Sequence, residues 1–483
     1  MNTPFVGAFE GRLVPFVALL GAVVGAAAVA LSPWVAVAIA LVVGAALLLV
    51  SRWLPGLFLT GLGIILAGYA FFGRSFAYLG VAPIYVGEMV LALSVLVTIR
   101  TAARQWLKLE LLIVAFMIWG LARTIPYIAS DGIDALRDGV LWGYALFALA
   151  LSVTVRREHF ERIRGPYAFL IPFFIAWVGF SAGLSYAQSL PLIPGTNVPI
   201  VIFKGGDMGV HLAGSIAFLI AGLWPGSPGA ASLLVTLLLP LWLVSVGVAG
   251  SLNRGGLFSA LAGWSAAAFI RPPARWWSAF AVAVLLFATA AVVDPNLDVG
   301  RARTVSVDQI VTNMASVLMS TGDDKLDATR DFRLRWWRDI LDYTLAGPYF
   351  WTGKGFGVNL ADDDGYQVKT DGSLRAPHNT HLTVLARMGV PGLVMWLLLM
   401  FGFGIQLVRA FLASRRAGAV FWCRIDAWLF AYWVAMLVNT SFDPYLEGPQ
   451  GGIWFWAVMG LGFAAIRAQQ VYAPRAPRAG TPA

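Results

Sequence analysis

Two histidines lie three residues apart in the segment APHNTHLTVLARMGVPG, and they are the strongest candidates for chemistry in the sequence. The whole chain holds only 4 histidines, so the closeness of His378 and His381 stands out. A neutral imidazole can take a proton from a hydroxyl group near pH 7, and such base catalysis speeds a step by ~10²–10⁴. We predict His378 as a catalytic base, and His381 as a residue that either faces the same site or packs. Asn379 or Thr380 has the side chain to cap a helix that begins here.

Arginines in two other segments have the chemistry to bind an anion. The segment TRDFRLRWWRDILDYTLAG at 329–347 has helical apolar spacing, which places Arg330, Arg333 and Trp337 on one face. Arg254 stands in GSLNRGGLF, at the start of an apolar run. A guanidinium group binds phosphate oxygens in pairs, so these arginines favour a diphosphate site. The alternatives are a basic amphipathic helix at the membrane surface and an arginine that reaches the lipid headgroups.

Two further motifs predict turns. WTGKGFGVNL at 351–360 lacks the strand and helix that a dinucleotide loop requires, and we expect a tight turn near the lipid surface. The run Asp362, Asp363 and Asp364 has oxygen ligands for a divalent cation but is more often a solvated turn. The sequence therefore predicts neither a metal site nor a cofactor.

The elements that must position these residues are membrane-spanning helices. Hydrophobic residues make up 59% of the 483 positions and charged residues 12%, whereas soluble domains have about 25% charged residues. This composition excludes a soluble enzyme and a disordered protein, and the single cysteine, Cys423, excludes an intramolecular disulfide. We predict an all-α polytopic membrane protein with about 12–14 transmembrane helices. The apolar runs lie at 13–31, 33–50, 54–72, 82–99, 107–122, 138–155, 166–185, 209–224, 230–249, 255–270, 277–293, 382–408, 425–441 and 452–467.

The distribution of charge predicts the orientation of these helices. Lys and Arg gather in alternate loops, which places the N- and C-termini in the cytoplasm and explains the net charge of +9 without nucleic acid. The predicted organisation is N-terminal transmembrane helices at 1–293, a periplasmic loop with short helices at 294–380, C-terminal transmembrane helices at 381–467, and a disordered cytoplasmic tail at 468–483. Polar residues gather at the outer interface instead of the midplane, which favours an enzyme over a transporter. They are Lys204, Asp207, Arg254, Arg333, His378, Asp443 and Glu447.

Taken in order, these segments resemble the bacterial O-antigen ligase and O-antigen polymerase superfamily of membrane glycosyltransferases. HNTHLTVLARMGVPG fits the family's His-Asn, nine residues, Gly-x-x-Gly pattern with His378, Asn379, Gly389 and Gly392. NRGG around Arg254, RLRWW at 333–337, GKGFG at 353–357 and DPYLEGPQGGIWFWAVMGLG at 443–462 resemble further family segments. The resemblance covers 240–465, about half of the chain. Arg387 departs from the pattern, because relatives often carry an acidic or neutral residue there; it is either an extra phosphate ligand or an arginine that points outward.

The resemblance implies a GT-C-like enzyme of the bacterial inner membrane that moves a glycan from an undecaprenyl diphosphate carrier at the periplasmic face, without a metal ion. His378 is then the base, and Arg254, Arg333 and Arg330 bind the diphosphate. Asn379, Trp337, His381 and Arg387 are supporting residues. The expected partners are the lipid-linked donor, a glycan or lipid acceptor, membrane lipids and envelope polysaccharide assembly proteins. The acceptor separates a ligase from a polymerase, and we favour the ligase. A precursor flippase and a non-catalytic scaffold remain as alternatives.

Overall fold

The computed structural model describes residues 51–81, 84–101, 105–185, 190–226, 228–270, 276–293, 297–298, 304–318, 324–368 and 372–472, with six positions between 42 and 49. The predicted span at 13–31 and most of that at 33–50 lie outside the described residues. The predicted tail also lies outside them, except for 468–472, which continue the last helix to Tyr472.

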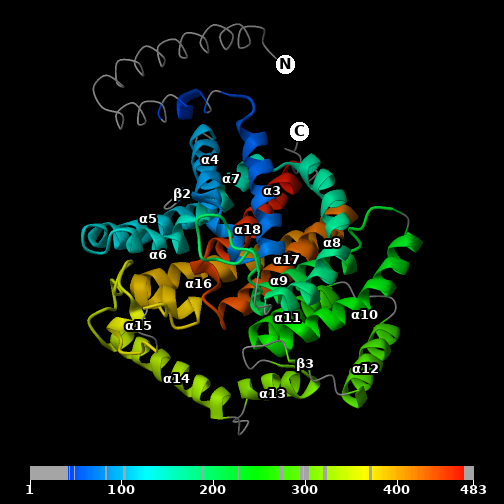
Figure 1. Cartoon of the computed structure of the whole chain (residues 1–483). Helices are drawn as coiled ribbons and strands as arrows, with labels where there is room; N and C mark the ends of the chain where they lie inside the picture. The colour runs from blue at the N-terminus through cyan, green and yellow to red at the C-terminus, as the bar shows by residue number, and fades with distance from the viewer. Residues whose placement is uncertain are drawn as a thin grey trace, which may run out of the picture.

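The described residues form an all-α membrane protein, as predicted (Figure 1). Every apolar run predicted within them is a helix. Seven of these helices are long and apolar enough to cross a membrane, or eight if α6 and α7, which meet at 41°, form one span. The helices are α3 (Leu54–Phe72), α4 (Val86–Arg100), α5 (Lys108–Asp131), α6 (Ile133–Gly143), α7 (Ala145–Thr154), α8 (Arg157–Ser185), α9 (Gly205–Ile220), α10 (Pro228–Leu252), α11 (Arg254–Ile270), α12 (Trp276–Val293), α16 (Thr380–Arg416), α17 (Val420–Thr440) and α18 (Pro449–Tyr472).

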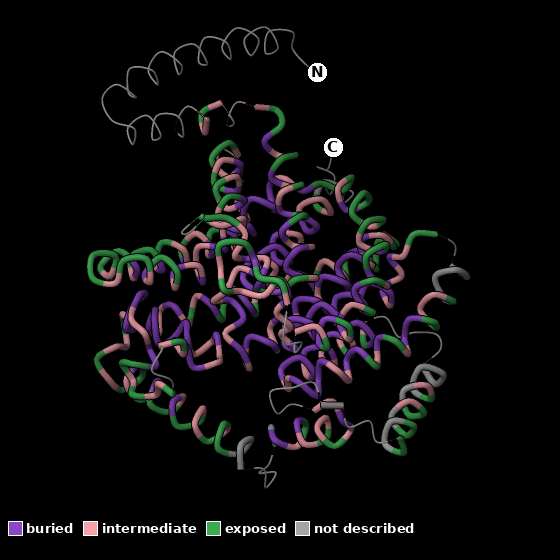
Figure 2. Tube along the Cα trace, viewed as in Figure 1, coloured by how far each residue is buried: buried purple, intermediate pink, exposed green. Residues whose placement is uncertain are grey.

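Helices α9, α11, α17 and α18 form the buried centre of the molecule (Figure 2). Small residues allow this packing. A Cβ atom on Gly209 of α9 would lie 2.1 Å from the carbonyl oxygen of Gly256 in α11, so the two backbones touch. In lipid, where apolar burial does not drive helix association, such close contacts supply the packing energy. The starts of α9 and α11 are thereby held together, and both carry polar residues of the candidate site.

The residues between α12 and α16 form a separate set of short elements, which we call the connecting segment. It contains the antiparallel strands β3 (Leu297–Asp298) and β4 (Thr304–Val305), the helices α13 (Val307–Leu318), α14 (Asp324–Leu341) and α15 (Leu360–Asp363), and a π-helical turn, η2 (Asp342–Ala346). Figure 1 shows α13 and α14 along the lower edge of the molecule, below α11 and α16. The helix predicted within 329–347 is therefore confirmed as α14 and the turn that continues it.

Helix α16 is broken at Gly389, and the connecting segment binds to the break. Gly389 has φ +66°, and a Cβ atom there would lie 2.5 Å from the carbonyl oxygen of Phe350. The amide of Val390 donates to that same oxygen at 2.7 Å, and the amide of Lys354 donates to the carbonyl of Ala386 at 2.7 Å. Only glycine fits this position, which gives the first glycine of the Gly-x-x-Gly pattern a physical reason.

The glycine turn at 353–357 is confirmed as a turn, and it is buried within the protein. Its three glycines all have positive φ, and a Cβ atom on Gly355 would lie 2.0 Å from the ring of Tyr127 in α5. The turn is thus inserted between α5 and the broken helix α16. Glycines are required because the backbone itself fills the space between the two helices.

Candidate active site

His378 lies directly before α16 in a strained backbone conformation. Its φ of +54° makes it the one non-glycine residue with positive φ in the described part of the chain. This region costs an ordinary residue roughly 1–3 kcal/mol and persists only where the surroundings enforce it. The side chain of Asn379 caps α16 by accepting from the amides of His381 and Leu382 at 3.0 and 3.2 Å, as predicted. On the other side, Trp337 Nε1 donates to the carbonyl oxygen of Pro377 at 2.8 Å.

The imidazole of His378 is neutral and forms no hydrogen bond within the described part of the chain. None of the described residues bonds to either ring nitrogen. Burial and the nearby Arg333 lower the pKa of His378 to about 4, and Asp443 only partly offsets this effect. At pH 7 the ring is therefore unprotonated, and its basic nitrogen is available to a ligand. This is the protonation state that a base requires.

Three arginines lie close to one another in this region, and one of them, Arg333, lies near His378. Arg333 in α14 donates to the carbonyl oxygen of Phe442 at 3.2 Å. Burial and the charge of Arg254 lower the pKa of Arg333 to about 10. Arg254, the first residue of α11, lies 3.4 Å from the hydroxyl of Ser316 and is repelled by Arg330.

These three guanidinium groups have the chemistry to hold an anion. Among the described residues, none of the three has a carboxylate within ion-pair distance. Cations held together without an acidic partner repel one another, and an anion that binds between them removes that cost. The predicted shared face of Arg330, Arg333 and Trp337 is consistent with this geometry, because Arg333 and Trp337 contact neighbouring backbone carbonyls.

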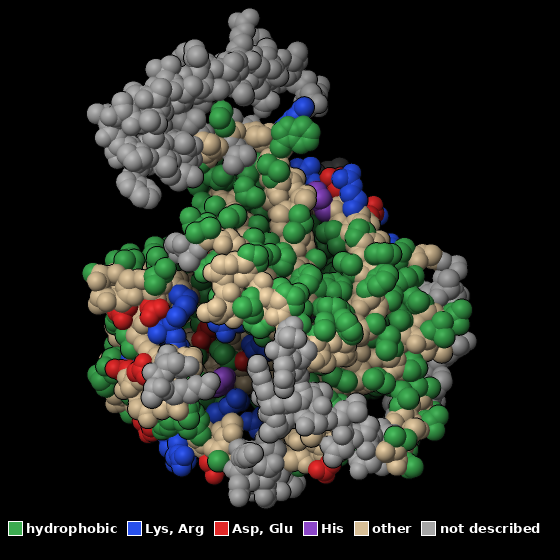
Figure 3. Space-filling view, in the orientation of Figure 1, with side chains coloured by type: hydrophobic (Ala, Val, Ile, Leu, Met, Phe, Trp, Pro, Cys, Tyr) green, Lys and Arg blue, Asp and Glu red, His purple; other side chains and the backbone are tan. Residues whose placement is uncertain are grey.

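A charged cluster lies near Arg333 and His378. Lys204 at the start of α9 places its Nζ 2.9 Å from Asp443 and 3.6 Å from Asp207. The carboxylates of Asp207 and Asp443 raise the pKa of Lys204 and outweigh the effect of its burial. Thr380 donates to the carbonyl oxygen of Asp443 at 3.4 Å, which ties this cluster to the start of α16. Figure 3 shows a hollow on this face of the molecule, lined by basic and acidic side chains with a histidine at its edge.

His381 packs, which is one of the two predicted alternatives. Its Nδ1 accepts from Trp396 Nε1 at 2.9 Å, and its Nε2 lies 3.1 Å from the hydroxyl of Ser441. Both ring nitrogens are therefore occupied by protein groups. The residue joins the first turn of α16 to the end of α17 and has no nitrogen left for a substrate.

Arg387 neither points outward nor lies free to bind phosphate, so both expectations for it need correction. Its side chain is 2% exposed, and its Nη2 lies 3.0 Å from a carboxylate oxygen of Asp138 in α6. It also donates to the carbonyl oxygens of Gly355 and Val358, both at 3.1 Å. Asp138 neutralises the charge of Arg387, and the arginine instead fixes the glycine turn against α16.

The acidic run at 362–364 also has protein partners. Lys354 forms ion pairs with Asp363 and Asp364, and Asp362 accepts from Gln367 Nε2 at 2.9 Å. The described residues contain no group of three His, Cys, Asp or Glu that could hold a metal ion. Lys354, which precedes Asp363 by nine residues, is therefore the partner of this acidic run.

The structure brings Arg333 near His378 and Arg254 near both Arg333 and Arg330, and it places Asn379 and Trp337 as supports of the histidine. Sequence reasoning missed Asp138, which holds Arg387 and also accepts from Arg375 at 2.9 Å. Its only sequence signal is an acidic residue at the first position of the predicted span 138–155. It missed Ser316 as well, which carries no signal because serine is common in any helix.

Comparison with known protein families matches residues 239–397 to the family described as O-antigen ligase. The matched region covers about a third of the chain and contains Arg254, Arg333 and His378. None of the curated proteins compared with the chain matches it. This region of the membrane-embedded chain is therefore similar to the O-antigen ligase family.

Proposed function

We propose that the protein is a glycosyltransferase that moves a glycan from undecaprenyl diphosphate to an acceptor hydroxyl, in the manner of an O-antigen ligase. The observation that carries this proposal is the strained, unbonded His378 near Arg333, one of three neighbouring arginines that lack a carboxylate partner among the described residues. A neutral base and an anion site are the two groups that this transfer needs. A sugar diphosphate already has a good leaving group, so charge stabilisation and one base suffice.

In the proposed reaction, an imidazole nitrogen of His378 accepts the proton of the acceptor hydroxyl. The acceptor oxygen forms a bond to the anomeric carbon of the donor sugar while the bond from that carbon to the diphosphate oxygen breaks. The electron pair of the broken bond stays on the diphosphate, whose charge Arg254, Arg333 and Arg330 balance. The imidazolium then releases its proton to water. No metal ion or cofactor takes part in this scheme.

The location of the site supports the same proposal. We place the protein in the bacterial inner membrane with both termini in the cytoplasm, because the basic residues gather in the predicted inner loops. His378, Arg333 and Lys204 then face the periplasm, where the polar part of a lipid-linked glycan meets the membrane surface. The proposed partners are this donor, a glycan or lipid acceptor, membrane lipids and other envelope polysaccharide assembly proteins.

The test is incubation of the purified protein with a defined undecaprenyl-diphosphate glycan and candidate acceptors, with and without a chelator. We expect the wild-type protein to form product in both conditions and His378→Ala to form little. Full activity of His378→Ala would remove the assigned base, and loss of activity with chelator would contradict the metal-free scheme.

A polymerase is the second candidate, because the same base and arginines serve both reactions. In that case the acceptor is a second lipid-linked repeat unit. Cells that lack the protein separate the two. Loss of a ligase leaves long polymer on the carrier lipid, whereas loss of a polymerase leaves single repeats.

A further inference from the structure

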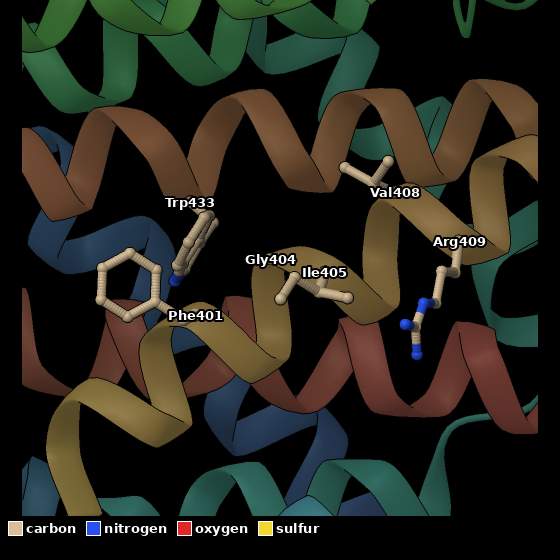
Figure 4. A pocket seen from close by; sticks show the side chains of 6 residues that line it. All are labelled: Phe401, Gly404, Ile405, Val408, Arg409 and Trp433. Atoms are coloured by element: carbon tan, nitrogen blue, oxygen red, sulfur yellow. The ribbon is translucent and has the colours of Figure 1, made fainter. Parts of the chain in front are cut away.

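A groove of about 440 Å³ lies toward the end of α16 that is opposite to His378 (Figure 4). Its lining side chains are apolar or aromatic except for Arg409. Phe401 and Ile405 are 68% and 50% exposed, as expected of side chains that face lipid. This groove is therefore part of the lipid-facing surface. A different kind of contact, polar and buried, lies where α13 covers the junction between α10 and α11.

Helical hydrogen bonding is interrupted at this junction, directly before Arg254. The side chain of Asn253 accepts from the amide of Gly256 at 3.0 Å and so caps the start of α11. The carbonyl oxygens of Gly250 and Ser251 consequently receive no amide from the following turn, which the structure describes in full. Arg254 thus projects from a corner of the backbone, and the position of that corner depends on how these two oxygens are satisfied.

Asn313 of α13 supplies the missing donors. Its Nδ2 donates to the carbonyl oxygens of Gly250 and Ser251 at 2.8 and 2.9 Å. Its Oδ1 accepts from Gln309 Nε2 at 3.2 Å, so the orientation of the amide is fixed from both sides. The side chain is 5% exposed. Because a buried acceptor that loses its donor costs more than an ordinary hydrogen bond contributes, the junction depends on this residue.

Ser316, one turn further along α13, contacts Arg254 itself. Its hydroxyl donates to the carbonyl oxygen of Asn313 at 2.9 Å, which leaves a lone pair for Arg254 Nη1 at 3.4 Å. Ser316 is 1% exposed and carries no charge. Arg387 provides the contrast, because the carboxylate of Asp138 neutralises it. A neutral partner orients Arg254 and leaves its positive charge for an anion.

We propose that Asn313 and Ser316 are positioning residues of the anion site, an inference that rests on the proposed function. Asn313 fixes the backbone corner from which Arg254 projects, and Ser316 orients the guanidinium group without neutralising it. Neither residue touches the donor in this assignment. Helices α13 and α14 both belong to the connecting segment, so this segment carries Arg333 and also holds Arg254. The two cations are thereby set for one ligand, the diphosphate of a lipid-linked glycan.

The test measures binding and transfer separately, with the full-length protein in detergent. Binding is measured with undecaprenyl diphosphate, and the rate with the defined lipid-linked donor and acceptor. Asn313→Ala should weaken binding of undecaprenyl diphosphate about tenfold, because a shift of about 1 Å in a positioned group has effects of up to 10²-fold. Met314→Ala is the matched control, since Met314 is the next residue of α13 and is 43% exposed. It should bind the diphosphate like the wild type.

Ser316→Asp and Ser316→Asn form a pair of similar size that differs in charge. The carboxylate pairs with Arg254, so Ser316→Asp should weaken diphosphate binding at least about tenfold more than Ser316→Asn. A residue that serves only the stability of the fold predicts equal losses for the two variants. Equal losses would therefore contradict the inference.

A double-mutant cycle shows whether Asn313 acts through Arg254. In the Arg254→Gln background, Asn313→Ala should cause no further loss of diphosphate binding, whereas independent effects multiply. Multiplied losses, or wild-type binding by Asn313→Ala, would overturn the inference. If these variants behave as expected but the wild type transfers no glycan, the proposed function fails and the positioning role stands. Unfolding temperatures show which variants fold, and the Ser316 pair decides the question if Asn313→Ala does not.

Discussion

Two histidines three residues apart have opposite surroundings in this protein. His378 ends the connecting segment with positive φ and no hydrogen bond to its ring from the described residues. His381 lies in the first turn of α16, and Trp396 and Ser441 occupy its two nitrogens. The two identical side chains thus differ in their hydrogen bonding. Protein groups occupy both ring nitrogens of His381, whereas those of His378 remain accessible to a ligand. The two residues are close in the sequence, but they differ in the hydrogen bonds that their rings form.

The largest loss of transfer rate is expected when His378 is replaced. His378→Ala should lower the rate of glycan transfer by ~10²–10⁴, because the acceptor hydroxyl loses its base. His381→Ala should lower it by less than tenfold and mainly destabilise the fold. The measurement is the initial transfer rate with a defined lipid-linked donor, with the unfolding temperature as a control. Equal losses of rate in the two variants would abolish the distinction between the two residues.

The next largest loss of transfer rate is expected when one cation is removed from the proposed anion site. Arg333→Gln should lower transfer by about 10², the usual result of removing one group that stabilises developing charge. Arg333→Lys should recover part of the rate, since it restores charge but not the paired geometry. Binding of the lipid diphosphate by each variant, measured beside the rate, checks the assignment. A variant that binds and reacts like the wild type would show that Arg333 has no contact with the donor.

A smaller effect should follow when the support of His378 is weakened. Trp337→Phe keeps the aromatic ring but removes the donor to the carbonyl of Pro377. The strained backbone should then relax, and misplacement of a reacting group by about 1 Å costs up to 10²-fold in rate. We expect roughly a tenfold loss with little change in donor affinity. Trp396→Phe is the matched change at His381, and we expect it to alter the unfolding temperature more than the rate.

The smallest effect concerns pH. Because burial and Arg333 lower the pKa of His378 to about 4, the neutral base persists from pH 8 down to pH 5. Transfer should therefore fall only as the pH approaches 4. In Arg333→Gln the residual activity should begin to fall at a higher pH, because loss of the cation raises the pKa of His378. A rate profile of the wild type that falls near pH 6.5, the usual pKa of histidine, would contradict the burial of the base.

Much of this arrangement follows from the sequence because it depends on local rules. Apolar runs predict the helices, and the side chain of Asn379 predicts the start of α16. Helical spacing predicts that Arg330, Arg333 and Trp337 share a face. These features need only the residues of one helix or one turn.

The parts that the sequence does not predict depend on contacts between distant segments. Arg387 contacts Asp138, which lies 249 positions earlier in the chain. The residues next to Arg387 in the sequence therefore do not indicate that it is buried. The glycine turn is buried because Tyr127 and α16 enclose it, although its composition suits an exposed turn equally well. The same limit applies to His381, whose two partners come from later in α16 and from the end of α17.

The break at Gly389 divides α16 into two parts with different neighbours. Hydrogen bonds from Lys354 and Gly355 tie the residues before the break to the connecting segment, whereas the residues after it pack against α17 and α18. The two parts stay joined across the glycine, because Trp396 donates to His381 at 2.9 Å and Val390 donates to the carbonyl oxygen of Phe350 at 2.7 Å. The bend therefore allows one helix to hold the end of the connecting segment, where His378 lies, against the spanning helices.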